Sequence, residues 1–241
     1  MKVYLNKITG FEDAIVSLLM SKRSWTREKE MELRNKMSEC IDCNGFVKED
    51  KQVAFNELFK AVEKYGIKHR HVTLVRFIDL SFTVEGLHRG AQDDFDSHAK
   101  RLDNRIVRAS TRLAKFQGSE KSDYYKDKIL TTEEVIDILG ITLPNQLVKD
   151  NKTYVKTVNG YVLEGLENDN DTLRGLYRLS IPSNFIFKVQ YPELCHIVQH
   201  RDKHSFANPE LRDMIEQLKV LVFEANPMLG LNLTTLKQQP K

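Results

Sequence analysis

The sequence predicts an α+β protein folded as a single domain. Stretches with the apolar spacing of helices are interspersed with runs in which apolar and polar residues alternate, as they do in strands. No internal repeat, low-complexity linker or clean boundary divides the 241 residues, a length that suffices for one large domain with a substantial core. Segment 120–170 is the least periodic and most polar part of the chain, so we expect an inserted helix–hairpin region there.

The first half of the chain is expected to open with a strand and to continue with helices. The alternating run VYLNKI predicts the strand, and three stretches with helical spacing follow it. Thr26 can cap the second of these helices, and Gly66 is the expected end of the third. HVTLVRFIDLSFTVEG then alternates throughout and predicts the clearest strand, or strand pair, of the sequence. Segment 87–116 returns to helical spacing, with a break near its basic cluster.

The second half is expected to contain a short helix, a hairpin and two longer helices. TTEEVIDILG has a capping-box start and a glycine stop. TYVKTVNGYVLEG reads as a hairpin joined by Asn159-Gly160, a dipeptide favoured in type I′ turns. YPELCHIVQHR and NPELRDMIEQLKVLVFEA have helical spacing, and Asn208 and Pro209 open the second of them. We expect the final LNLTTLKQQPK to fray.

Composition limits the classes of partner. Charged residues make up 29% of the chain and the formal net charge is +3, so binding to a polyanion would have to come from a local cluster. No apolar run approaches the roughly 18–20 residues of a membrane span. The first twenty residues also lack the order of a signal peptide. We therefore expect no membrane partner and a cytoplasmic location.

The three cysteines give little indication of a metal or redox site. Cys40 and Cys43 form a C-x-x-C pair, and Cys195 is far along the chain. A zinc site would need two more ligands, and the nearest histidines, His69 and His71, are distant in sequence. The pair also ends a charged helical stretch, whereas a thioredoxin-like pair follows a strand and opens a helix. A structural or incidental role is favoured, with no metal, in a reducing compartment.

FDSHAKRLDNRIVRASTR, residues 95–112, is the most basic stretch of the chain. It is either the solvated face of a helix or part of a site for an anionic ligand. A single arginine on a helix is most often a solvated cation, and Ser110 or Thr111 can simply cap a helix. The chain has no phosphate loop, dinucleotide fingerprint, zincin helix or nucleophile elbow. The order of the basic and hydroxyl residues therefore has to decide between the two interpretations.

That order resembles the flavin-dependent thymidylate synthases. In that family a histidine precedes a strand, a helix then runs into an Arg-His-Arg triplet, and a Ser-x-Arg element follows. Farther along come an arginine before an apolar–proline pair and a segment that opens a final helix. Here HRHVTLVRFIDLSFTVEGLHRGAQDDFDSHAKRLDNRIVRASTR, YRLSIP and HRDKHSFANPELRDM occupy these places, so the resemblance covers 65–112 and 174–220. The matched positions are His71, His98, Ser110, Arg112, Arg178, Arg201 and His204.

The resemblance implies a fold, an activity and a set of partners. The fold would be one α+β domain with a mixed or antiparallel sheet flanked by helices. The activity would be transfer of a one-carbon unit from methylenetetrahydrofolate to C5 of deoxyuridine monophosphate (dUMP), with FAD as cofactor and NADPH as reductant. The assembly would be a homotetramer whose sites form between chains.

The resemblance also implies residue roles that agree with the chemistry. A nucleotide phosphate is a dianion, which arginine forks and a serine hydroxyl can hold, so Ser110, Arg112 and Arg178 would bind it. Arg201 would bind the substrate and act as the catalytic residue, since a fixed guanidinium stabilises negative charge that develops on the pyrimidine. The cofactor-side residues would be His71, His98, Lys100, Arg101 and His204.

Several positions depart from the family pattern. Ser97 and Ala99 stand where the triplet has arginines, with Lys100 and Arg101 directly after them. The gap to Ser110 is longer than in the family, and the family's N-x-R element is replaced by QYP. These departures favour altered pyrimidine chemistry on the same fold, such as hydroxymethylation. They also permit a non-catalytic protein.

A nucleic-acid-binding protein is the alternative from another class. KILTTEEVIDILGITLPNQLV resembles the first helix and turn of a helix-turn-helix, and YVKTVNGYVLEG could form a wing after it. The expected recognition helix, LPNQLVKDNK, has few basic residues and a proline near its start. A capped surface helix followed by a hairpin is favoured, so nucleic acid is not the expected partner.

Overall fold

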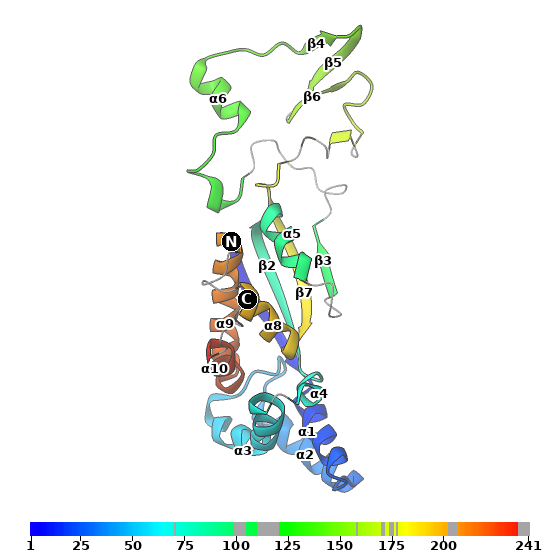
Figure 1. The fold of residues 1–241 in the computed structure, drawn as a ribbon, viewed down its shortest axis with the longest axis vertical. Helices are drawn as coiled ribbons and strands as arrows, with labels where there is room; N and C mark the ends of the chain where they lie inside the picture. Colours follow the sequence, from blue (N-terminus) through cyan, green and yellow to red (C-terminus); the bar gives the residue numbers. More distant parts are fainter. Residues whose placement is uncertain are drawn as a thin grey trace.

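A four-stranded antiparallel sheet in the order β1-β2-β7-β3 lies at the centre of the molecule (Figure 1). Its strands are β1 (Lys2–Thr9), β2 (Asp79–His88), β7 (Pro182–Gln190) and β3 (Arg105–Arg108). The computed structural model describes residues 1–69, 71–98, 105–109, 121–157, 159–169, 172–173, 176, 178–201 and 207–235. The expected α+β class, with an antiparallel sheet and helices, is confirmed.

Helices cover one face of this sheet (Figure 1). They are α5 (Arg89–His98), α8 (Tyr191–Arg201) and α9 (Pro209–Ala225), with α10 (Pro227–Thr235) packed on α9. Alternate strand residues point inward, and the rings of Phe82 and Phe187 stack with centroids 5.1 Å apart. Phe95 of α5 packs edge-on against Phe187. The core is therefore continuous from the sheet into the helices.

The opposite face of the sheet is open. Tyr4 pairs with Thr83, Thr83 with Ile186 and Ile186 with Val107, so these four side chains form one row across the four strands. Tyr4 is 41% exposed, Ile186 45% and Val107 71%. An apolar row in the middle of a sheet is a surface that a partner can cover.

A group of helices forms one end of the molecule (Figure 1). They are α1 (Phe11–Ser21), α2 (Arg27–Cys40), α3 (Gln52–Val62), a π-helix η2 (Glu63–Lys68) and α4 (Val72–Val75), with a 3₁₀ turn η1 (Glu49–Lys51) before α3. Phe11 packs edge-on against Phe55 and Phe59, at 5.1 and 5.6 Å. Thr26 caps α2 by accepting a hydrogen bond from the backbone N–H of Lys29, as the sequence predicts.

The segment that follows β3 lies at the opposite end (Figure 1). It contains a 3₁₀ turn η4 (Asp123–Tyr125), α6 (Thr132–Leu139) and a second antiparallel sheet of β4 (Gln146–Lys149), β5 (Lys152–Thr157) and β6 (Gly160–Leu163). The predicted capping box of α6 is present between Thr131 and Glu134, and Gly140 ends the helix at a φ of 63°. Val162 is the one buried apolar side chain among the described residues of 121–176.

Several expectations about local structure are wrong. The first part of the predicted strand 71–86 forms α4, and only its second part is a strand. Gly66 does not end a helix, because the chain continues as a π-helix through it, where an added Cβ would lie 2.8 Å from Cγ1 of Val75. Residues 227–235 form α10 and are anchored in the core by Leu229 and Leu233, so much of the last stretch does not fray.

The predicted hairpin is present as β5 and β6, but the position of its turn differs from the expectation. Thr157 pairs with Gly160, so residues 158 and 159 link β5 and β6. The turn with two positive φ values is instead Asp150-Asn151, at 51° and 57°, between β4 and β5. Residues 146–149, predicted as part of a recognition helix, form the strand β4. The helix-turn-helix interpretation is therefore wrong.

Candidate functional site

Arg201 is held where three helices meet. Its Nη2 lies 3.0 Å from Oδ1 of Asp94, in the middle of α5. Oδ2 of Asp94 accepts a hydrogen bond from the backbone N–H of Asn208, at 3.3 Å, where α9 begins. Arg201 ends α8, and its side chain is 17% exposed. The carboxylate of Asp94 therefore joins the end of one helix to the beginning of another and orients the guanidinium.

His88 joins the first turns of α5 and α9. Its Nδ1 accepts a hydrogen bond from the backbone N–H of Ala91, at 3.1 Å, so Nε2 carries the proton and donates to Oδ1 of Asn208, at 3.1 Å. The carboxylate of Glu210 accepts from the backbone N–H of His88, at 3.0 Å. Burial raises the pKa of Glu210, and that hydrogen bond opposes the rise. Because two helices begin side by side here, the positive ends of their dipoles lie close together.

The first residues of the inserted segment dock on this histidine. The ring of Tyr125 meets His88 edge-on at 4.8 Å, and Tyr124 stacks on it at 6.1 Å. The backbone N–H of Ser122 donates to the carbonyl oxygen of Ser180, at 2.9 Å. His88 is 2% exposed, so the contact belongs to the core and anchors the inserted segment beside the start of α5.

Further arginines surround the acidic face of α5. Nε of Arg89 lies 3.4 Å from Oδ1 of Asp93, and Nη1 of Arg108, on β3, lies 3.7 Å from the same oxygen. Arg108 also forms an ion pair with Asp96. Burial and the nearby charge of Arg89 lower the pKa of Arg108. Arg108, one of the cations of the basic stretch, is therefore paired within the chain by carboxylates of the helix before it.

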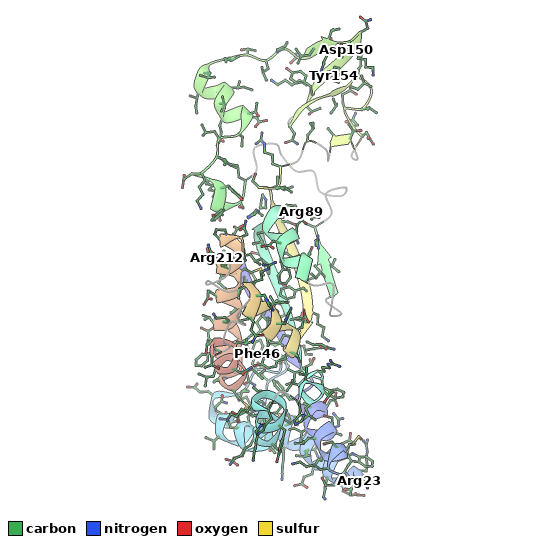
Figure 2. All side chains as sticks on the ribbon, in the orientation of Figure 1. Arg23, Phe46, Arg89, Asp150, Tyr154 and Arg212 are labelled. Carbon is green, nitrogen blue, oxygen red and sulfur yellow. The ribbon has the colours of Figure 1, made fainter. Side chains whose placement is uncertain are left out.

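Arg178 contacts a different element from Arg201. Its Nη2 donates to Oγ1 of Thr132, at 3.3 Å, and lies 3.6 Å from Oε2 of Glu133, both on α6. The residue after it, Leu179, accepts a hydrogen bond from the backbone N–H of Gly90. Arg178 therefore lies near the beginning of α5, where Figure 2 labels Arg89, whereas Arg201 contacts the middle of that helix.

Of the remaining predicted site residues, two are described by the structure and five are not. His71 is exposed at the N-terminal end of α4, and His98 is the last residue of α5. The helix of His98 and the side chain of Arg201 are thus brought together by Asp94. Ser110, Arg112, Lys100, Arg101 and His204 lie outside the described residues.

A cavity of about 520 Å³ lies between η2, α4, α8 and α10. Its apolar walls include Ile67, Val72 and Pro192, and its polar groups include His196 and Gln199. Val72 follows the predicted His71, and Pro192 ends the QYP sequence. Sequence reasoning missed this cavity, because its walls come from three distant segments and no local pattern marks them.

Glu193, on the first turn of α8, is a buried carboxyl group that sequence reasoning also missed. It is 1% exposed, and neither of its oxygens has a hydrogen-bond partner among the described residues. Burial raises its pKa to about 7. The sequence gives no signal for this, since a glutamate in a first helical turn is usually solvated.

The described residues contain no group of three His, Cys, Asp or Glu side chains arranged to hold a metal ion. Cys40 and Cys43 are free thiols, the first buried and the second exposed. Within the same residues no helix is long and apolar enough to cross a bilayer.

Comparison with known proteins finds similarity in fold. No protein-family model matches the sequence, and no curated protein sequence matches it. A flavin-dependent thymidylate synthase from Helicobacter pylori, solved with FAD and dUMP, superposes with a TM-score of 0.53 at 13% identity, over 92% of this chain and 93% of that one. A UMP/dUMP methylase from Streptomyces cacaoi, bound to 5-Br dUMP, superposes with a TM-score of 0.55 at 11% identity, over 100% and 97%. The fold implied by the sequence resemblance is therefore confirmed over nearly the whole chain.

Proposed function

We propose that this chain, which has the fold of the flavin-dependent thymidylate synthases, is an enzyme that transfers a one-carbon unit to C5 of a pyrimidine nucleoside monophosphate. dUMP is the first candidate substrate, methylenetetrahydrofolate the donor and NADPH the reductant. Both kinds of similar structure were solved with a pyrimidine nucleotide bound, which supports this substrate class.

The observation that carries the proposal is the contact between Arg201 and Asp94. It places a charged guanidinium beside the helix that ends in His98, so the segments chosen for substrate and cofactor lie together. When hydride from a reduced flavin adds at C6 of the pyrimidine, negative charge would move onto a ring carbonyl oxygen. A guanidinium already fixed by Asp94 can stabilise that charge without reorganisation. Arg201 is therefore the proposed catalytic residue.

The nucleotide phosphate would be held by Ser110, Arg112 and Arg178. Arg178 can turn toward it at small cost, because its contact with Glu133 is long, at 3.6 Å, and partly exposed. The adjoining first turns of α5 and α9 add the positive ends of two helix dipoles on the same side of the molecule.

The cavity beside α4 and α8 fits a planar cofactor ring. Its volume is within the usual range for small-molecule sites, and it combines apolar walls with a few polar groups. Ile67, Val72 and Pro192 would pack on the ring, while His196 and Gln199 would contact its polar edge. His71, His98, Lys100, Arg101 and His204 are the further proposed cofactor residues. A reduced FAD bound here would supply the hydride that converts the transferred carbon into a methyl group.

A homotetramer is part of the proposal. The open row Tyr4, Thr83, Ile186 and Val107 leaves apolar side chains in solvent across the sheet, which favours burial against another copy. A neighbouring copy would also supply residues to each site.

Hydroxymethyl transfer is the second candidate. Ser97 and Ala99 replace two triplet arginines and weaken the case for a bound flavin. Without a hydride, water would add to the transferred methylene group and the product would carry a hydroxymethyl group.

The test uses dUMP that carries tritium at C5, because one-carbon transfer to C5 releases that hydrogen. Tritium release that requires methylenetetrahydrofolate is the expected result, and the product mass distinguishes methyl from hydroxymethyl. The absorbance spectrum after incubation with FAD and desalting reports flavin retention. A chain that neither binds dUMP nor releases tritium, with or without FAD, contradicts the proposal.

A further inference from the structure

One face of the second sheet combines lysine and tyrosine side chains. On this face, Lys152 of β5 pairs with Lys149 of β4, and Lys156 of β5 pairs with Tyr161 of β6. Tyr154, between them on β5, pairs with Leu147 on one side and Leu163 on the other. Residues that pair across antiparallel strands project on the same side, as do residues two apart along a strand. We call Lys149, Lys152, Tyr154, Lys156 and Tyr161 the lysine–tyrosine face.

The other side of the same sheet faces the rest of the chain. Val162 projects there and is 4% exposed, and a Cβ added at Gly160 would lie 3.5 Å from the side chain of Leu176. Val148, also on that side, is 75% exposed at the edge strand, so the cover is confined to the part next to β6. On the lysine–tyrosine face, all three lysines are exposed, Leu147 is 44% exposed and Leu163 37%. This face is therefore the open side of the sheet.

The lysines on the face form no ion pairs among the described residues. Lys149, Lys152 and Lys156 are all exposed. The strands QLVK, KTYVKT and GYVL contain no acidic residue. Three exposed lysines therefore gather on this side of the sheet, and the nearest acidic residues in sequence are Asp150, in the turn between Lys149 and Lys152, and Glu164, directly after β6.

The ring of Tyr154 lies between two lysines, and that of Tyr161 lies beside one. Tyr154 stands two residues from Lys152 and two from Lys156 along β5, about 6.6 Å from each at the usual rise of a strand. The hydroxyl of Tyr161 donates to the carbonyl oxygen of Pro144, which holds that ring across β5. Figure 2 labels Tyr154, and the turn residue Asp150, at the end of the molecule opposite Arg23.

We propose that the lysine–tyrosine face binds single-stranded nucleic acid, DNA or RNA. Proteins that hold single strands combine aromatic rings, on which bases stack, with cations that follow the phosphates. Tyr154 would receive a base between the flanking leucines, and the lysines on either side would contact the adjacent phosphates. The site is short, so binding would be weak and would extend over a few nucleotides.

The arrangement favours this ligand over others. A protein that binds double-stranded DNA needs an element that enters a groove. The helix next to this sheet in the sequence, α6, begins with the acidic Glu133 and Glu134, which phosphates would repel. An acidic peptide would pair with the lysines but would leave the central ring of Tyr154 without a planar partner. The proposal does not depend on the one-carbon chemistry, since none of these residues belongs to the candidate active site.

The test measures fluorescence anisotropy of labelled oligonucleotides with the full chain. Single-stranded DNA, single-stranded RNA and a duplex of the same sequence are compared over a salt series. Three phosphate contacts predict that log K falls with log salt at a slope of about −2 for a single strand. The single strands should bind more tightly than the duplex, and the comparison of DNA with RNA identifies the preferred sugar.

Variants separate the contribution of the lysine charges to binding from that of base stacking on Tyr154. Lys152→Gln with Lys156→Gln should reduce the slope to about −0.7, whereas Lys2→Gln with Lys7→Gln, the same charge change on exposed positions of β1, should leave it unchanged. Tyr154→Ala should weaken binding roughly 5- to 100-fold with little change in slope, and Tyr154→Phe should restore it. Circular dichroism and tritium release from dUMP should stay at wild-type levels in all of them.

Three results would overturn the proposal. One is no single-strand binding at low salt by a folded wild-type chain. Another is an equal loss of binding in the two double-lysine variants. The third is binding to anionic phosphatidylserine vesicles, or to a poly-glutamate peptide, that needs the same lysines and displaces the oligonucleotide, since either outcome would assign the face to a different partner.

Discussion

The guanidinium of Arg201 lies 3.0 Å from the carboxylate of Asp94, on a helix that is distant from it in sequence. A second contact fixes Asp94 itself, because its other oxygen accepts the backbone N–H of Asn208. The ion pair is partly exposed, with Arg201 at 17% and Asp94 at 30%, so its contribution to stability is small. Its effect on the orientation of Arg201 is the larger consequence.

Arg201→Ala should therefore reduce function more than stability. We expect a roughly 10- to 100-fold loss of dUMP affinity, as for removal of a charge-assisted hydrogen bond, and a fall of a few degrees in Tm. Calorimetric titration with dUMP and thermal unfolding measure the two effects. Arg23→Ala, an exposed arginine at the far end of the molecule, is the matched control and should change neither. Unchanged dUMP affinity in Arg201→Ala would exclude the proposed role.

Glu193 should make the protein less stable at high pH. Its pKa is raised by burial from 4.5 to about 7, so the folded state retains a proton that the unfolded state releases between these values. Stability should fall as the pH rises from about 4.5 to about 7 and then level off, by about 3 kcal/mol in total. Urea unfolding at pH 5 and pH 8 measures the difference.

Glu193→Gln should remove most of that pH dependence, because the amide resembles the neutral carboxyl group and cannot ionise. Glu224→Gln, at an exposed position of α9, is the control and should retain the wild-type dependence. If Glu193→Gln unfolds with the same difference between pH 5 and pH 8 as the wild type, the assigned titration is wrong.

Glu134 should make the segment around α6 less stable at low pH, the opposite of the pH effect expected for Glu193. Its pKa is lowered to about 2 by the backbone N–H of Thr131 and by Lys121, whose Nζ lies 2.9 Å from each carboxylate oxygen. The contribution to stability is present above about 4.5 and is lost as the pH falls toward 2. Limited pepsin digestion should cut segment 121–140 first as the pH is lowered. Cleavage that begins in the central sheet would contradict this.

Lys121→Ala should loosen the same segment at neutral pH. The Lys121 side chain is 8% exposed, and its Nζ also donates to the carbonyl oxygens of Lys126 and Ile129. Trypsin or chymotrypsin should cut this variant near α6 faster than the wild type. Lys149→Ala, at an exposed position of β4 in the same segment, is the control, and equal cleavage rates in the two variants would show that the Lys121 contacts do not hold the segment.

Gly10 should tolerate no side chain. It has a φ of 92° where α1 begins, and an added Cβ would lie 1.8 Å from the carbonyl oxygen of Phe77. Gly10→Ala should therefore lower the free energy of unfolding by several kcal/mol, on the order of 4 or more, or prevent folding. Gly140→Ala is the control, because its φ of 63° is also positive but no atom lies within 4 Å of the added Cβ. It should cost about 1 kcal/mol in urea unfolding.

Local sequence signals predicted most of the helices, strand β1 and much of β2, but not β3 or β7. Thr26, Thr131 with Glu134, and Asn208 cap the helices as expected, since a cap acts over three or four residues. Strand β7 was missed, although Phe185, Phe187 and Val189 alternate with exposed or half-buried positions, because its partners come from segments about one hundred residues away. Residues 72–75 alternate like a strand, but α4 packs against η2 and α8.

The candidate site was predictable only in part. A resemblance could select Arg201, but it could not give the partner Asp94, because that contact depends on how α5 and α8 pack. Arg108 belongs to the basic stretch, and no local pattern indicates that folding pairs it with Asp93 and Asp96. The turn at Asp150-Asn151 could have been predicted, since both residue types accept positive φ. The tight turn was predicted at Asn159-Gly160 instead, because that dipeptide is favoured in type I′ turns.

The scarcity of buried apolar side chains in segment 121–176 has a consequence for cooperativity. With Val162 as its one buried apolar residue among those described, this segment gains little from hydrophobic burial, whereas the central sheet shares a continuous core with the helices. The small sheet can open and close while the large one stays folded. Amide hydrogens of β5 should therefore exchange with solvent through frequent local opening, and those of β2 only when the whole molecule unfolds. The chain would thus contain two units that differ in stability, and substitutions that destabilise the second sheet would leave the central sheet folded.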